Sequence, residues 1–342
     1  MIIKNAITFL VTIIILTLIP YTSIVHTSEE NKISVVTSIH TLESIVREIG
    51  GPYVDVCHLI PENVEPHTFQ LTPDVIRKAV NAKLLVLTGH FQFENDLIEV
   101  LGDANERMIL RLEDNMYYGG QPIKILNILD KGYNLHAYWL LPENAITVAS
   151  VIRDALSTID PKHSNYYTWS FLQFKSKVES LARRYRDIAE KYGIREAKAV
   201  IAFPSEQYIV EPLGLQIVGV ISVGHGVTIT GHELLKIEDI LRTSKNPIII
   251  ASDIAFKMKV GDFVEKLAES VNAKIVHVKV LEDDLEYTEL LSYNLGAIAQ
   301  AFIEDVNERC TDIVNATPLV ILTLIFMGLA IVEGVMLWKR AM

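Results

Sequence analysis

Short apolar runs alternate with segments of helical periodicity over residues 33 to 160 of the chain. The runs are rich in Val, Ile and Leu and have the length of buried strands, whereas the segments between them repeat apolar residues every three or four positions. Such alternation is typical of a parallel sheet covered by helices. The pattern predicts strands at 33–38, 53–60 and 84–87, and helices at 42–49, 73–80 and 142–156.

A much longer helical pattern follows, over residues 161 to 192. Its apolar residues recur in steps of three and four, at Tyr167, Phe171, Phe174, Val178, Leu181 and Tyr185. Pro161 stands near the start and Gly193 just past the end, which are the positions that these residues favour at helix termini. We expect this single helix to connect two α/β segments as a strut.

The alternation then resumes, with strands predicted at 199–203, 215–221, 247–252 and 273–280, and helices at 234–241, 260–271 and 287–304. The predicted fold class is therefore α/β: two Rossmann-like lobes with parallel sheets, joined by one long helix. The expected boundaries are 33–160 for the N-terminal lobe, 161–193 for the connecting helix and 194–308 for the C-terminal lobe. In such folds, ligands bind at the C-terminal ends of the strands, here in the cleft between the lobes.

Both ends of the chain carry apolar segments outside this body. Residues 1–28 place Lys4 before a short apolar run, which predicts a secretion signal, with a retained N-terminal anchor as the alternative. Residues 317–338 are almost wholly apolar and long enough for one transmembrane helix. Lys339 and Arg340 follow directly, and basic residues stay on the cytoplasmic side. We therefore expect a single-pass cell-membrane protein with an extracytoplasmic body and a cytoplasmic tail.

The 342 residues include 31 basic and 42 acidic side chains, which give a formal net charge of −11. An acidic balance argues against nucleic-acid binding and is compatible with a cationic ligand. The two cysteines, Cys57 and Cys310, lie far apart and do not make a disulfide framework. The sequence leaves open whether they pair.

Four side chains at predicted strand ends, or in the loops after them, are candidate metal ligands: His67, His136, Glu206 and Asp253. Two imidazoles with two carboxylates suit zinc, manganese or iron and disfavour copper(I). Each signal is weak by itself, because a single loop histidine is more often a surface residue. Asp253 has a second interpretation, since an aspartate at a strand end is frequently a helix cap.

Two motifs strengthen the case that these positions are metal ligands. Val64-Glu65-Pro66-His67, followed by Thr72-Pro73, is similar to the first metal-binding loop of the zinc/manganese solute-binding proteins of ABC importers. His136 with the stretch Trp139 to Ala145 resembles the element that carries their second ligand. The resemblance covers residues 33 to 303 and implies a receptor, not an enzyme, that binds divalent zinc or manganese as its transported ligand. It also implies an ABC importer permease in the membrane as the partner, and it places Asp253 as the last carboxylate ligand.

The chain departs from the family pattern at the third ligand. The spacing to Tyr208 and Gly214 puts Phe203 at that position, and a phenyl ring cannot bind a metal. Glu206, His225 in the next glycine-flanked loop, or water could fill the place, and the sequence does not choose among them. His40, after the first strand, is a candidate for a residue that contacts the metal ligands and orients them without binding the metal itself.

Two other classes of function stay open. A tethered metal-dependent hydrolase would use an open coordination position to activate water, but the chain has no His-Glu-x-x-His or Gly-x-Ser-x-Gly motif. An adhesion or scaffold module that has lost its metal site is the other, and Phe203 is its main support. The identity of the metal is also open, because carboxylates favour manganese or iron and imidazoles favour zinc.

Overall fold

The computed structural model describes residues 31–61, 64–102, 107–112, 117–118, 121–129, 132–224, 227–258, 260–281 and 284–303. The predicted signal segment at 1–28, the predicted membrane span at 317–338, His225 and Cys310 lie outside these ranges. Among the described residues, no helix combines the length and the apolar character needed to cross a membrane. Cys57, which is described, is a free thiol in the second strand.

The first sheet has four parallel strands in the order β2-β1-β3-β4. These strands are β1 Ile33–Thr37, β2 Val54–His58, β3 Leu84–Leu87 and β4 Met108–Arg111. The helices between them are α2 His40–Gly50, α3 Pro73–Asn81 and α4 Gln92–Leu101, with 3-10 turns η1 Gly51–Tyr53 and η2 Pro66–Thr68. All four residues of β3 are buried, as the continuous apolar run predicted.

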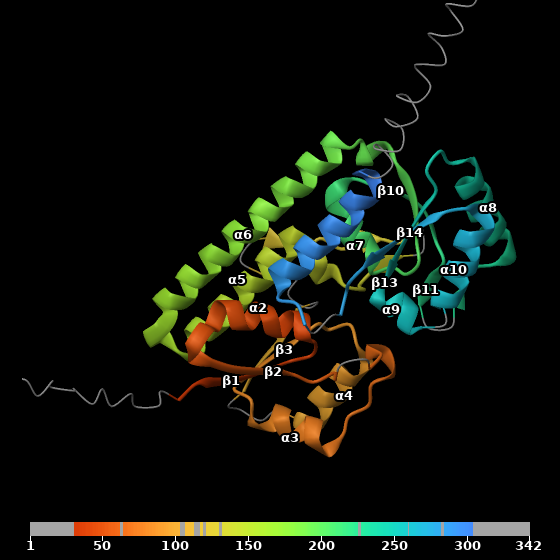
Figure 1. The fold of residues 1–342 in the computed structure, drawn as a ribbon. Coiled ribbons are helices and arrows are strands. Elements are labelled where there is room, and N and C mark those ends of the chain that lie inside the picture. Colours follow the sequence, from red (N-terminus) through yellow and green to blue (C-terminus); the bar gives the residue numbers. More distant parts are fainter. Residues whose placement is uncertain are drawn as a thin grey trace, which may run out of the picture. The chain divides into compact units, whose positions relative to one another are not determined.

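The segment after β4 contains short hairpins and two helices that lead into the second sheet. The hairpin strands are β5 Tyr117–Tyr118, β6 Gln121–Pro122, β7 Leu126–Asn127 and β8 Tyr133–Asn134, and they are followed by the 3-10 turn η3 Tyr138–Leu140 and helix α5 Pro142–Ile159. The predicted long helix is α6 Ser164–Lys191, and Pro161–His163 before it forms a separate 3-10 turn, η4. Helix α6 packs against α5 and α2 (Figure 1).

The second sheet repeats the strand order of the first, as β10-β9-β13-β14, again all parallel. Its strands are β9 Lys198–Ile201, β10 Gln216–Val220, β13 Ile248–Ser252 and β14 Lys274–Val278, with a small hairpin of β11 Ser222–Gly224 and β12 Val227–Thr228. Its helices and turns are η5 Ile194–Glu196, α7 Glu206–Val210, η6 Glu211–Leu213, α8 Gly231–Thr243, α9 Asp253–Lys257 and α10 Val260–Val271. The prediction of two parallel-sheet α/β segments joined by one long helix is confirmed.

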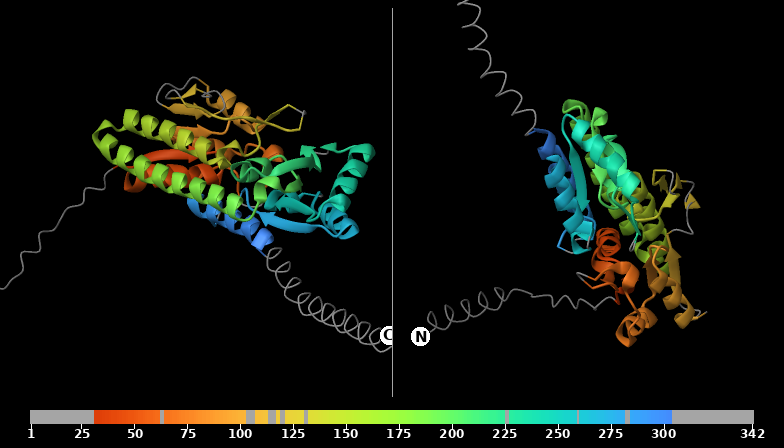
Figure 2. Two further views of the ribbon diagram at one scale, coloured as in Figure 1. Left: turned by 90° about the horizontal axis from the view of Figure 1, so that it is seen from above. Right: turned by 90° about the vertical axis from the view of Figure 1, so that its right-hand side faces the viewer.

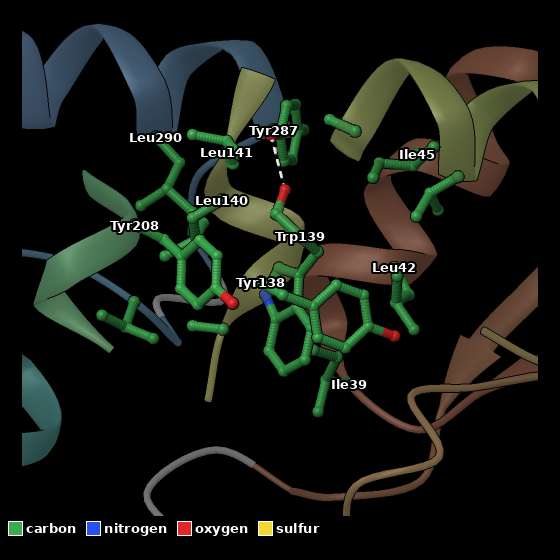
Figure 3. Close-up of a cluster of buried hydrophobic side chains, with 14 of the residues drawn as sticks. Ile39, Leu42, Ile45, Tyr138, Trp139, Leu140, Leu141, Tyr208, Tyr287 and Leu290 are labelled. Carbon is green, nitrogen blue, oxygen red and sulfur yellow. Dashed lines mark hydrogen bonds between the residues drawn. The ribbon is translucent and has the colours of Figure 1, made fainter. Parts of the chain in front are cut away.

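A last described helix, over residues 287–303, returns from the second sheet to pack beside α6. Figure 2 shows this helix in blue along the green α6, and Tyr185 of α6 donates a hydrogen bond of 2.6 Å to the carbonyl oxygen of Leu291. At its start, Tyr287 donates to the carbonyl oxygen of Trp139 at 2.7 Å. Figure 3 shows this bond inside a buried cluster that contains α2, η3 and α7 side chains. The core therefore connects segments from before and after α6.

Candidate metal centre

Three histidines from the chain before α6 come together: His67, His90 and His136. One ring nitrogen of each lies within 4.8 Å of those of the other two. The ring centroids are 4.8 Å apart for His67 and His90, 4.5 Å for His90 and His136, and 5.4 Å for His67 and His136. Three convergent imidazoles, with water as a fourth ligand, are a donor set that binds zinc in proteins.

Hydrogen bonds from the backbone to the side chain of Glu65 fix the loop that carries His67. The loop follows β2, and the carboxylate of Glu65 accepts the backbone N–H groups of His67 at 3.1 Å and Thr68 at 2.9 Å. Pro66 supplies the first position of the 3-10 turn, where its missing N–H costs nothing. The Glu-Pro-His motif is therefore a capped turn that presents the imidazole.

His90 follows β3 through Gly89, whose positive φ of 81° favours glycine. The backbone N–H of His90 donates to the hydroxyl of Thr88 at 3.1 Å. Burial lowers the pKa of His90 to about 4, with a further contribution from His67, so this imidazole is neutral at physiological pH. Its Nε2 is buried and has no hydrogen-bond partner within the described part of the chain. A neutral imidazole with an unused nitrogen is the form that binds a metal.

Asn134 at the end of β8 orients His136 and connects it to the second sheet. Its side-chain oxygen accepts the backbone N–H of His136 at 3.0 Å. Its amide nitrogen donates to the carbonyl oxygen of Pro204 at 2.8 Å and to Gln207 at 2.9 Å. The imidazole is thus aimed by a residue that also contacts the loop after β9.

The second sheet closes the site with apolar groups. A cavity of about 30 Å³ lies against the three histidines, and its other walls include Phe203, Ile254, Val280 and Leu281. The ring of Phe203 meets that of His136 edge-on, with centroids 5.1 Å apart. The cavity volume exceeds the roughly 10–15 Å³ that a single water molecule needs. The site has room for an ion with a small additional ligand and little more.

The structure does not bring Glu206 to the imidazoles. Glu206 begins α7, is fully buried, and accepts from the backbone N–H of Phe203 at 2.5 Å and of Ser252 at 2.9 Å. The hydroxyl of Ser252 donates to the same carboxylate. Burial raises the pKa of Glu206 to about 8, although these hydrogen bonds oppose the rise. Glu206 does lie just after the first strand of the second lobe, as predicted. Its carboxylate, however, holds β9 and β13 together and does not reach the imidazoles.

Asp253 also uses its carboxylate on the backbone. It begins α9, and its two oxygens accept the N–H groups of Val280 at 2.7 Å and Leu281 at 3.3 Å, in the loop after β14. Neither Asp253 nor Glu206 is among the described residues whose ligand atoms gather with the three histidines. His40 lies instead in a separate group with Glu43 and His58.

His90 is not among the ligands predicted from the sequence. The available signal was its place in Thr88-Gly89-His90, directly after a fully buried strand at the centre of the sheet. Side chains after such strands gather at one edge of a parallel sheet. His67 and His90 both occupy that edge.

Two parallel-sheet lobes joined through one long helix are the architecture of a solute-binding protein, and the histidine cluster is of the kind that binds metal ions. A family model described as zinc-uptake complex component A, periplasmic (ZnuA), matches residues 35–301. The chain belongs to this family, whose members are substrate-binding proteins and not enzymes.

Curated relatives are similar along most of their length. The manganese ABC transporter substrate-binding lipoprotein PsaA of Streptococcus pneumoniae serotype 4 is 21% identical over 286 residues, which cover 80% of this chain and 90% of PsaA. The high-affinity zinc uptake system protein ZnuA of Bacillus subtilis is 22% identical over 297 residues, which cover 81% and 89%. These homologues are metal-binding components of zinc or manganese importers.

Solved structures show the same fold. A crystal structure of ZnuA superposes with a TM-score of 0.65 at 22% identity, and covers 80% of this chain and 100% of its own. The periplasmic zinc-binding protein TroA of Treponema pallidum gives 0.67 at 17% identity, with 80% and 99% covered. The laminin-binding protein Lmb of Streptococcus agalactiae gives 0.66 at 23% identity, with 79% and 99% covered.

Proposed function

We propose that this chain is the extracytoplasmic substrate-binding component of a metal importer, which captures a divalent transition metal and delivers it to an ABC permease. The convergence of His67, His90 and His136 carries this proposal. Membership of a family of metal-binding importer components supports it. The metal is the transported ligand, so the site has to bind it and also release it.

The proposed ligands are His67, His90 and His136, with water as the fourth. Phe203 supplies no donor, and the carboxylates of Glu206 and Asp253 are occupied by backbone amides. A site of three imidazoles favours zinc over manganese, because manganese prefers carboxylate and carbonyl oxygens. The carboxylates of Glu206 and Asp253, which would favour manganese, bind backbone amides instead, and His90 and the apolar wall lie beside His67 and His136.

Removal of one imidazole tests the ligand set. We expect His67→Ala or His90→Ala to weaken zinc binding by more than the roughly 10- to 100-fold that loss of an outer partner causes. Competitive titration of the full chain with zinc and manganese would measure both affinity and preference. His232→Ala is the matched control, because His232 belongs to neither histidine cluster. Unchanged zinc affinity in both ligand variants, or a preference for manganese, would contradict the proposal.

Release would require only a small movement. Helix α6 is continuous over 28 residues and connects the two sheets, so a wide hinge motion is disfavoured. All three proposed ligands precede α6, whereas the apolar walls Phe203, Ile254 and Val280 follow it. Displacement of the apolar walls by the permease would therefore expose the metal without breaking a metal–ligand bond.

We further propose that the body is held at the outer face of the cell membrane. The apolar run at 317–338 with Lys339 and Arg340 supports this, as do relatives that are lipoproteins outside the cytoplasm. Residues 1–28 would direct export. We also propose the lobe boundaries 33–160, 161–193 and 194–308, which the alternation of strands and helices in the sequence supports. The last described helix then counts with the second lobe, because it follows that lobe's strands in the chain.

An adhesive role is a second candidate, and Phe203 at the expected third ligand position is the observation in its favour. The similar protein Lmb is described as bifunctional, with adhesin and metal transporting activity. If this chain were an adhesin without a metal site, the purified protein would bind its partner equally with and without chelator and would contain no stoichiometric metal. If the wild-type chain contained stoichiometric zinc and His67→Ala lost it, an adhesin without a metal site would be excluded.

A further inference from the structure

A second group of potential ligands lies in the first lobe, formed by His40, Glu43 and His58. His58 Nδ1 is 2.5 Å from Glu43 Oε2, and His40 Nδ1 is 4.0 Å from the same oxygen. The two imidazole rings stand perpendicular, at 87°, with centroids 5.5 Å apart. One donor atom of each residue lies within 4.8 Å of the other two.

The topology of the first sheet builds this group. His40 and Glu43 are three residues apart at the N-terminal end of α2, so they share one face of that helix. His58 is the last residue of β2, which pairs in parallel with β1 so that Thr37 stands opposite His58. Because α2 follows β1 directly, the N-terminal end of α2 meets the C-terminal end of β2.

His40 provides an independent sign of a ligand. Its side chain is only 10% exposed; Nδ1 is the ring nitrogen near Glu43, and Nε2, the other ring nitrogen, is buried without a hydrogen-bond partner among the residues that the structure describes. It also lines a cavity of about 70 Å³, together with Glu65, Lys257, Met258 and other residues. A buried polar atom without a partner is unfavourable unless something binds it. A hydrogen-bonded His58–Glu43 pair that served only to fasten α2 to β2 would not need this second imidazole.

Of the two carboxylate oxygens of Glu43, one binds Arg47 and the other is bonded to His58, so a metal would take the place of the proton between Glu43 and His58. Arg47 binds Glu43 Oε1 and also Glu286 Oε1, the latter at 2.7 Å. These three residues sum to one negative charge, and Glu43 Oε2 faces the two imidazoles. In the neighbouring cavity, Lys257 is accompanied by Glu65. Two imidazoles and one carboxylate oxygen are a donor set for zinc and similar borderline cations.

We propose that His40, Glu43 and His58 form a second binding site for a divalent transition metal, separate from the centre of His67, His90 and His136. The cavity that His40 lines shares Glu65, Pro66, Ile254 and Leu281 with the cavity at the three-histidine centre. His40 is the member of the second group that lines this neighbouring cavity, so the second site is adjacent to the first.

Counting bound zinc in the full chain, purified in detergent, tests the second site. Equilibrium dialysis with zinc, followed by elemental analysis, should give two ions for the wild type and for His232→Ala. His40→Ala and His67→Ala should each give one, and the double variant should give none. If His40→Ala bound as many zinc ions as the wild type, the second site would be overturned.

Thermal unfolding gives a second readout that does not depend on counting. In the His67→Ala background, zinc should raise the melting temperature through the second site, and adding His40→Ala should abolish that rise. If His40 were only structural, His40→Ala would change the melting temperature of the metal-free protein and leave the zinc-induced rise intact. Loss of an ion in His40→Ala but not in His67→Ala would uphold the second site and contradict the central one, so the two claims fail separately.

Discussion

At the scale of single residues, Phe203 distinguishes the proposed metal site of His67, His90 and His136. It occupies the position where the family resemblance expects a third ligand, and its ring packs edge-on against His136. His90, from the loop after β3, supplies the third imidazole instead. This exchange keeps three donors but draws them all from the chain before α6.

Restoring a donor at this position should strengthen binding. We expect Phe203→His to lower the zinc dissociation constant by about tenfold or more, equivalent to about 1.4 kcal/mol, because a fourth imidazole would replace water. Phe203→Leu, which keeps the wall apolar, is the control and should leave the constant within about twofold. Titration with a competing chelator would measure both. A Phe203→His protein that binds zinc no better than Phe203→Leu would show that Phe203 does not face the metal.

At the scale of elements, one buried glutamate organises the strand ends in each lobe. Glu94 of α4 accepts the backbone N–H of Thr88 after β3 and the hydroxyl of Ser38 after β1. Glu206 of α7 accepts the backbone N–H of Phe203 after β9 and of Ser252 at the end of β13. Each carboxylate therefore ties the loop after one central strand to its neighbour, at the edge where the site lies.

The buried Glu206 should make stability depend on pH. Its pKa of about 8 in the folded protein exceeds the ordinary value of 4.5, so the folded state holds the proton more strongly than the unfolded state does. The contribution of Glu206 to the free energy of unfolding is fully present below about pH 4.5. It falls as the pH rises toward 8, by up to about 1.4 kcal/mol per pH unit. Urea unfolding of the metal-free protein across this range would show the slope. Glu206→Gln should lack this part of the slope, and an identical pH profile in both proteins would contradict the assignment.

Long periodic segments could be predicted from the sequence because local pattern and burial agree there. The strand at 84–87 and the helix at 260–271 have the predicted bounds. Helix α8 begins at Gly231, earlier than predicted, because Thr230 and Glu233 form a capping box that extends it. Hairpin strands of two residues, such as β7 and β8, are too short to carry a periodic signal.

His67 and His136 could be predicted from motifs, whereas the inward turn of Glu206 depends on Ser252, which is distant in sequence.

At the scale of the whole molecule, described contacts connect the elements before α6 with those after it. Tyr287 bonds the carbonyl oxygen of Trp139 (Figure 3), and the ammonium group of Lys124 lies 2.7 Å from the carboxylate of Glu211. Asn134 bonds the carbonyl oxygen of Pro204. These contacts and the continuous α6 favour a receptor that changes shape only slightly between its loaded and empty states.

The proposed tether makes a prediction for the full chain in cells. Alkaline carbonate should leave it in the membrane fraction, because a span of about 20 apolar residues inserts stably. A chain that ends at residue 308 should be released if the N-terminal segment is cleaved, and should stay if that segment is a retained anchor. Immunoblots of the two fractions would measure both. Release of the full chain would contradict a transmembrane helix at 317–338.

The central claim is that His67, His90 and His136 together hold the transported metal. Crystals of the zinc-loaded protein, measured on both sides of the zinc absorption edge, test it most directly, because anomalous difference density marks zinc itself. We expect the strongest peak among these three imidazoles, beside Phe203, with each ligand nitrogen about 2.0–2.1 Å from the zinc. An empty three-histidine centre in crystals that hold zinc elsewhere, or a peak ligated by Glu206 and Asp253 instead, would contradict it.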